Sequence, residues 1–151
     1  MYKIQCDKNL MKVLVKFFSS LKIDAEITCF SENKADISIL RNADKINVNA
    51  DCLIINSDDK ELMDRIKSSN GRIISCGLST RSTVTFSSIS DNDFVLCTQR
   101  SIFSLAKKKI PPFELPFKCI GKAYDEVSIL MIITAALLCG AEVSQLNKIY
   151  L

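Results

Sequence analysis

The sequence of 151 residues contains no histidine and only four glycines. Without histidine, neither a Ser-His-Asp triad nor a zinc site that mixes cysteine with histidine can form. Each glycine stands alone, so the chain has no glycine-rich loop in which consecutive backbone N–H groups could cradle a phosphate. The first predicted turn from a strand to a helix instead reads CDKN (residues 6–9), which places the Asp7 carboxylate where such a phosphate would lie.

Proline is also scarce, with three residues, and the charges nearly balance, with 20 basic against 17 acidic residues. Few prolines and glycines argue against linkers, so we expect one domain over residues 1–151. The net charge of +3 is too small to indicate nucleic-acid binding. No signal peptide is recognisable, and the most apolar run (residues 127–141) is shorter than the ~20 residues that span a bilayer. We therefore expect a cytoplasmic protein that binds neither nucleic acid nor membrane.

The seven cysteines are too far apart in sequence for a Cys-x-x-Cys metal motif, and their odd number argues against a full disulfide framework. Most of them lie within or at the end of apolar runs, which is typical of reduced thiols that pack as small apolar side chains. We predict no metal site, no bound cofactor and no catalytic cysteine. The cysteines are Cys6, Cys29, Cys52, Cys76, Cys97, Cys119 and Cys139.

The first half of the chain predicts strands alternating with helices. An apolar stripe at helical spacing predicts a helix over Asn9–Leu21, with Asp7 or Asn9 as its N-cap. Because the segment Cys52–Asn56 begins with a continuous apolar run, we expect a parallel strand covered on both faces. Other predicted strands are Tyr2–Cys6, Glu26–Phe30, Asp36–Leu40 and Arg72–Cys76.

Between Cys52–Asn56 and Arg72–Cys76 we predict a helix over Lys60–Ser69, capped by Asp58 and ended by Asn70 and Gly71 in a left-handed conformation. A strand–helix–strand unit of this kind builds a parallel sheet.

In the second half, short turns separate further strands, which predicts an antiparallel meander attached to the parallel sheet. Lys107–Lys109 is expected at an exposed hairpin tip. An apolar helix over Asp125–Cys139, ended by Gly140, and a short helix over Glu142–Tyr150 follow. The predicted fold class is α/β, with a three-layer, mostly parallel sheet. The meander strands are Thr83–Ile89, Phe94–Thr98, Ile102–Leu105 and Phe113–Cys119.

Asn56 is the polar residue best placed for function, because ligands of parallel sheets bind at the carboxyl ends of the strands. The carboxylate pairs have structural interpretations instead, as helix caps or in turns. These pairs are Asp58 and Asp59, Asp91 and Asp93, and Asp125 and Glu126.

Several segments in order resemble the central domain of the Mur ligases, which use ATP to add amino acids to UDP-N-acetylmuramoyl precursors of the bacterial cell wall. They are ADISILRN (35–42), CLIINSDD (52–59), RIISCGL (72–78), the meander at 84–100 and the closing turn and helix at 121–146. The resemblance implies ligand contacts at strand ends, and Glu26 is similar to a magnesium-binding glutamate of the family. The candidate ligand-binding residues are Glu26, Asn42, Asn56, Asp58 and Asp59.

The departures from the family pattern concern its catalytic parts. Residues 7–9 replace the family's Gly-Lys-Thr phosphate loop, and Ala123, Tyr124 and Val127 stand near the positions of its adenine-contacting asparagines. The family's carbamylated lysine has no counterpart, and its two other domains do not fit within this length. These departures favour a non-catalytic, Mur ligase-like binding or regulatory module linked to cell-wall precursor metabolism, which acts with a protein partner or as a homo-oligomer. The alternative is a partner-dependent fragment of an ATP-dependent amide ligase.

Overall fold

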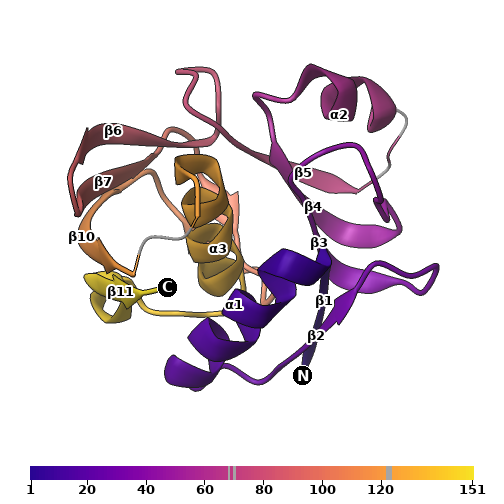
Figure 1. Cartoon of the computed structure of the whole chain (residues 1–151), viewed down its shortest axis with the longest axis horizontal. Coiled ribbons are helices and arrows are strands. Elements are labelled where there is room, and N and C mark those ends of the chain that lie inside the picture. The colour runs from indigo at the N-terminus through magenta and orange to yellow at the C-terminus, as the bar shows by residue number, and fades with distance from the viewer. Residues whose placement is uncertain (68, 70, 122–123) are drawn as a thin grey trace.

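A computed structural model of the chain describes residues 1–67, 69, 71–121 and 124–151, and places most strands in one sheet (Figure 1). The described elements are β1 (Tyr2–Cys6), α1 (Lys8–Ser20), β2 (Ala25–Cys29), β3 (Ala35–Leu40), β4 (Ala50–Asn56), α2 (Lys60–Arg65), β5 (Arg72–Cys76), β6 (Val84–Ser90), β7 (Asp93–Thr98), β8 (Ile102–Phe103), β9 (Lys109–Ile110), β10 (Glu114–Ile120), α3 (Glu126–Leu138), the 3₁₀ helix η1 (Val143–Leu146) and β11 (Lys148–Tyr150).

Within the described residues, the main sheet has nine strands in the order β11-β10-β7-β6-β5-β4-β3-β1-β2. The strands from β2 to β6 in this order are all parallel, β7 is antiparallel to both β6 and β10, and β11 is parallel to β10. The fold is therefore α/β, and the predicted mostly parallel sheet with attached antiparallel strands is confirmed.

The direction in which the chain adds strands reverses at β1. The chain passes from β1 through α1 to β2 on one side, and then crosses to β3 on the other side of β1. In α/β sheets, ligands bind outside the carboxyl ends of the strands at such a reversal point. Here that position lies just after Cys6 and Leu40, the last residues of β1 and β3.

Apolar side chains cover both faces of the parallel strands, as alternation along β4 demonstrates. Cys52 and Ile54 belong to the larger core, which contains α1 and α3, whereas Leu53 and Ile55 belong to a second core with Leu62 of α2. Figure 1 places α1 and α3 on one side of the parallel strands and α2 on the other. This part of the sheet is thus covered on both faces, as the continuous apolar run predicts.

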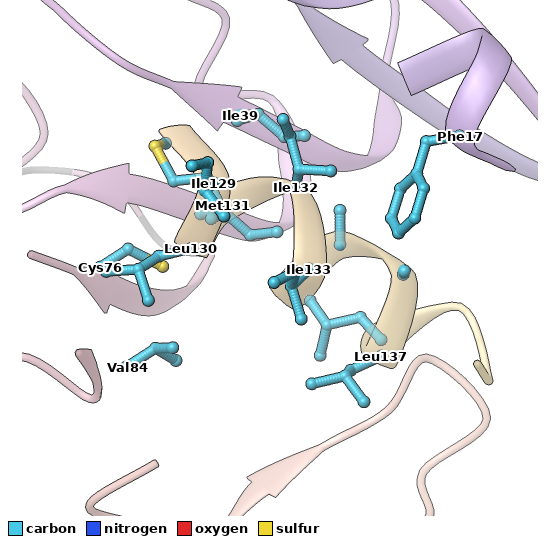
Figure 2. Packing of buried hydrophobic residues seen from close by; sticks show 14 of the residues in the cluster. Phe17, Ile39, Cys76, Val84, Ile129, Leu130, Met131, Ile132, Ile133 and Leu137 are labelled. Carbon is cyan, nitrogen blue, oxygen red and sulfur yellow. The ribbon is translucent and has the colours of Figure 1, made fainter. Parts of the chain in front are cut away.

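Helix α3 is buried from every direction, because every residue from Ser128 to Leu138 is buried. The two parts of the sheet lie on either side of this helix. β5 and β6 pair only between Cys76 and Val84, so the sheet separates there. Figure 1 shows the antiparallel strands on the opposite side of α3 from the parallel ones. Figure 2 shows α3 side chains directed toward Ile39, Phe17 and Cys76. A helix without a polar face can fold in water only when its surroundings enclose it.

Both ends of α3 match the sequence prediction. Asp125 is the N-cap and accepts a hydrogen bond from the backbone N–H of Ser128 at 2.7 Å. Gly140 follows the last turn with φ +94°, and the backbone N–H of Ala141 reaches back to Ala136 O at 3.0 Å. Such left-handed glycine ends satisfy the last carbonyls of a helix. The helix has 13 residues, and no helix in the described part of the chain is long and apolar enough to pass through a membrane.

The predicted helix over Glu142–Tyr150 is wrong. Residues Val143–Leu146 form a single 3₁₀ turn, and Lys148–Tyr150 is a strand parallel to β10. Only Ile149 of this strand is buried, so its side-chain alternation fits a strand better than a helix. The open edge of β10 offers backbone hydrogen bonds to these residues, whereas an isolated helix this short is only marginally stable in water.

The prediction for α2 gives the first residue, Lys60, correctly, but its N-cap and its end are wrong. Asp59, and not Asp58, is the N-cap, and it accepts from Leu62 N at 3.0 Å. The helix ends at Ile66, and Gly71 has no positive φ; a Cβ on Gly71 would lie 2.7 Å from Ala50 O, so this glycine permits close strand contact. Asn70 lies outside the described residues, as does Ala123.

The prediction that Ile102–Leu105 continues the meander is also wrong. The shorter β8 pairs with β9 in a separate antiparallel pair, and the backbone N–H of Leu105 donates to Leu138 O at the end of α3. Lys107–Lys109 is exposed around the turn of this hairpin, as expected, with Lys107 at φ +64°.

The enclosure of α3 predicts a large effect of cavity formation. We expect Ile132→Ala, at a fully buried position, to lower the free energy of unfolding by about 2–5 kcal/mol. The control Val15→Ala changes a side chain of α1 that is 51% exposed. We expect this control to change the free energy of unfolding by about 0.5 kcal/mol or less. Urea unfolding measures both, and equal losses in the two variants would contradict the enclosed position of Ile132.

Candidate functional site

An ion pair occupies the reversal point of the sheet. Asp7 follows β1, Arg41 follows β3, and the Arg41 side chain donates from Nε to Asp7 Oδ2 at 2.6 Å and from Nη2 to Asp7 Oδ1 at 2.7 Å. This two-point geometry is the strong form of the arginine–carboxylate interaction. Both side chains are partly buried, with 21% of Arg41 and 30% of Asp7 exposed, so the pair is screened less than a surface ion pair.

Asp7 is also the N-cap of α1. Its Oδ1 accepts a hydrogen bond from the backbone N–H of Leu10 at 3.0 Å. The N-terminus of a helix attracts anions through its unpaired N–H groups and its dipole. In this chain a carboxylate of the protein itself occupies that anion position.

The protonation of Asp7 follows from these contacts. Partial burial opposes its ionisation, but the hydrogen bonds from Arg41 and from the Leu10 backbone outweigh burial and hold the pKa of Asp7 below its usual range. The hydrogen bond to Asp7 likewise raises the pKa of Arg41. Both groups are therefore charged at neutral pH.

Arg41 connects three elements at this end of the sheet. Its Nη1 donates to Ser128 Oγ in the first turn of α3 at 3.3 Å, and its backbone carbonyl accepts from Asn56 Nδ2 at 3.1 Å. The guanidinium is thus held between the N-termini of α1 and α3, and Asn56 fixes the backbone from β4. Its direction is set before any ligand arrives.

A polar cavity of about 330 Å³ lies beside the ion pair. Its size is at the lower limit for pockets that bind small molecules. Its lining carries both charge signs together with amide groups and one aromatic ring, so it suits a small polar ligand better than a polyanion. The lining residues are Asp7, Asn9, Phe30, Arg41, Asn42, Asp44 and Lys45.

The structure places four of the five predicted site residues at the carboxyl ends of β3 and β4, mostly in local hydrogen bonds. Asn42 Oδ1 accepts from Asp44 N at 3.1 Å, and Asn56 Oδ1 accepts from Asp58 N at 3.0 Å. Asp58 Oδ2 in turn accepts from Leu78 N at 2.9 Å, which joins the loops after β4 and β5. Only Asn42 of this group lines the cavity beside Arg41.

Glu26 lies apart from these residues. It is exposed on the edge strand β2 and pairs in register with Lys3, near the beginning of β1. The amino ends of parallel strands lie at one end of the sheet and their carboxyl ends at the other. Glu26 is therefore not brought together with Asn42 or Asn56.

The central pair of the site was not among the predicted site residues. The sequence pattern indicates Asp7 as a helix cap and as an obstacle to phosphate, and it assigns no role to Arg41. A signal was present, because residues of opposite charge directly follow two predicted strands. Using this signal requires knowledge that β1 and β3, the strands that precede Asp7 and Arg41, are neighbours in the sheet.

Among the described side chains, no group of three His, Cys, Asp or Glu residues could hold a metal ion. The cysteines are reduced; five are buried, Cys97 is half-buried and Cys29 is exposed. Burial raises the pKa of Cys6, Cys76 and Cys139 to about 12 and that of Cys52 to about 11. These thiols are protonated at neutral pH and are poor nucleophiles.

No family model matches the chain, and a search of the curated proteins finds none with a matching sequence. Functional conclusions therefore depend on the fold and on the contacts at the strand ends.

The Asp7–Arg41 pair predicts a specific dependence of stability on pH. We expect Arg41→Met to lower the free energy of unfolding by about 1–3 kcal/mol at pH 7. Because the folded pKa of Asp7 is depressed, the pair stabilises the fold above the unfolded pKa of about 3.9, and this stabilisation is lost as the pH falls through the folded value. Below pH 4, the difference in the free energy of unfolding between the wild type and Arg41→Met should therefore shrink, and urea unfolding measures it.

Lys67→Gln provides the matched control, because it removes the exposed pair with Asp64. Its effect should stay within about 0.5 kcal/mol at any pH. A wild-type advantage over Arg41→Met that persists undiminished at pH 2 would contradict the role assigned to Asp7.

Thiol burial predicts the order of alkylation. In the folded protein at pH 8, iodoacetamide should modify Cys29 first, Cys97 more slowly and the five buried thiols only after denaturation. Mass spectrometry of tryptic peptides locates the adducts, and Cys29→Ser should abolish the rapid phase. Rapid modification of Cys76 in the native protein would contradict its burial.

Proposed function

We propose that this chain is a non-catalytic, Mur ligase-like binding module whose strand-end cavity takes a small polar ligand, and that it acts with a protein partner or as a homo-oligomer in cell-wall precursor metabolism. The Asp7–Arg41 ion pair carries the proposal, because it occupies the position that an ATP-dependent ligase would need for nucleotide phosphates. The link to the cell wall is supported by the resemblance of residues 35–146 alone.

The electrostatic argument has two parts. A phosphate approaching the N-terminus of α1 meets the Asp7 carboxylate, which repels it and already accepts from Leu10 N. Arg41, the cation bonded to Asp7, is already engaged with Asp7 and Ser128. Phosphoryl transfer depends almost entirely on positioning and charge neutralisation, so this arrangement opposes it.

Two features of the fold support the Mur ligase-like part of the proposal. The parallel sheet continues into the antiparallel strands β7 and β10, as the resemblance implies. Asn56 ends the buried strand β4, and Asp58 and Asp59 follow it, in the order expected from the family segment.

The proposal predicts that Mg-ATP does not stabilise the protein. A ligand present at 100 times its Kd adds ~2.7 kcal/mol of stability, which corresponds to a rise in Tm of about 5–10 °C for a chain of this size. We expect no rise at millimolar Mg-ATP in the wild type, measured by thermal unfolding. Asp7→Asn keeps an oxygen that can cap α1 but removes the charge, so weak stabilisation by Mg-ATP should be easier to detect in this variant.

A clear rise in wild-type Tm that Arg41→Met abolishes would overturn the proposal, since it would place the nucleotide at this pair. A rise seen only when a co-purifying ligase-like protein is added would favour the partner-dependent ligase fragment instead.

A further inference from the structure

A second cavity, of about 300 Å³, lies where the two parts of the main sheet separate. One wall is formed by Arg72 and Ile73 at the start of β5, and the other by Arg100 and Phe103 in and before β8. Ile102, which is 4% exposed, also lines it. This cavity shares no lining residue with the one beside Arg41.

The two arginines are held by hydrogen bonds to neutral groups. Arg72 Nη1 donates to Phe103 O at 2.9 Å, and Arg100 donates from Nη1 to Thr83 Oγ1 at 2.8 Å and from Nη2 to Arg81 O at 3.1 Å. Neither forms an ion pair with a carboxylate in the described part of the chain, and the four residues outside it are not acidic. Fixed guanidinium groups with unused N–H donors favour a carboxylate ligand.

Large apolar side chains stand beside these charges. Ile73 is 45% exposed and Phe103 is 47% exposed. Isoleucine and phenylalanine are usually buried in the cores of folded proteins. Arginine and aromatic residues are enriched where proteins bind other proteins, and isolated lysines are depleted there. The composition of this cavity therefore favours a protein partner.

The main chain of β5 is also open here. β5 pairs with β4 along its whole length but meets β6 only at Cys76. Arg72 and Ile73, its first two residues, are exposed and have no strand partner on the β6 side among the described elements, whereas Ile74 is buried. An unpaired strand edge can hydrogen-bond an extended segment of another chain.

We propose that this cavity binds an acidic, extended segment of a protein partner. One carboxylate of the segment lies between Arg72 and Arg100, a neighbouring aliphatic side chain packs on Ile73 and Phe103, and the segment's main chain follows the free edge of β5. Two arginines beside an apolar floor suit a single carboxylate better than nucleic acid, which requires a broad basic surface. The proposal does not depend on what the cavity beside Arg41 binds.

A short peptide tests this directly. The probe is a fluorescein-labelled hexapeptide that alternates glutamate with leucine, titrated with the full chain at low salt and followed by fluorescence anisotropy. We expect saturable binding that Arg72→Gln and Phe103→Ala each weaken by about fivefold to tenfold. Both side chains are exposed, so both variants should fold, and thermal unfolding checks this. Backbone amide signals of residues 72–74 should shift in NMR spectra of the wild type.

Two controls separate specific binding from general charge attraction. The same peptide with glutamine for glutamate should bind at least fivefold more weakly, and Lys12→Gln, which removes an exposed charge on α1, should leave affinity within about twofold. The proposal is overturned by absence of saturation up to about 1 mM, by equal affinity for the two peptides, or by an equal loss in Lys12→Gln. Displacement of the peptide by an equal concentration of a thymidine oligonucleotide would also overturn it, as would self-association of the chain that Phe103→Ala abolishes.

Discussion

The fold depends on the need to enclose α3. This helix has no polar face along most of its length, so it must be surrounded, and a flat sheet with one helix layer would leave one side in water. The chain meets this requirement by separating its sheet at a single bridging pair and placing parallel strands on one side of the helix and antiparallel strands on the other. α1 and the hairpin of β8 and β9 close the remaining directions, with Leu105 bonded to the last turn of α3.

The same helix sets up the candidate site. Because α3 is fixed in the core, its first turn presents Ser128 to Arg41, and this contact helps to hold the guanidinium against Asp7. A charged pair at a partly buried position is sensitive to the loss of either member, since the remaining charge would be left without compensation. The site therefore combines a rigid support with a fixed internal salt bridge at the N-terminus of α1.

Sequence patterns predict those elements whose own residues decide them. The apolar run of α3 with Asp125 and Gly140 at its ends, and the continuous apolar strand β4, were predictable because composition and caps act locally. Contacts between distant segments decided the rest. Asp58 is drawn to Leu78 N, which leaves Asp59 as the cap, and Lys148–Tyr150 becomes a strand because β10 has an open edge. The Asp7–Arg41 pair joins residues 34 apart and depends on the strand order around β1, which local patterns do not contain.

The position of α3 in the chain has a consequence for how the protein is made. Both parts of the sheet precede this helix in sequence, apart from β11, yet the apolar surfaces of both are buried against it. During synthesis the strands leave the ribosome first, and the faces that pack on α3, including Ile39 of β3, lack that cover until α3 follows. The core is thus completed only after α3 has been synthesised, and until then the nascent chain carries exposed apolar surface of the kind that chaperones bind.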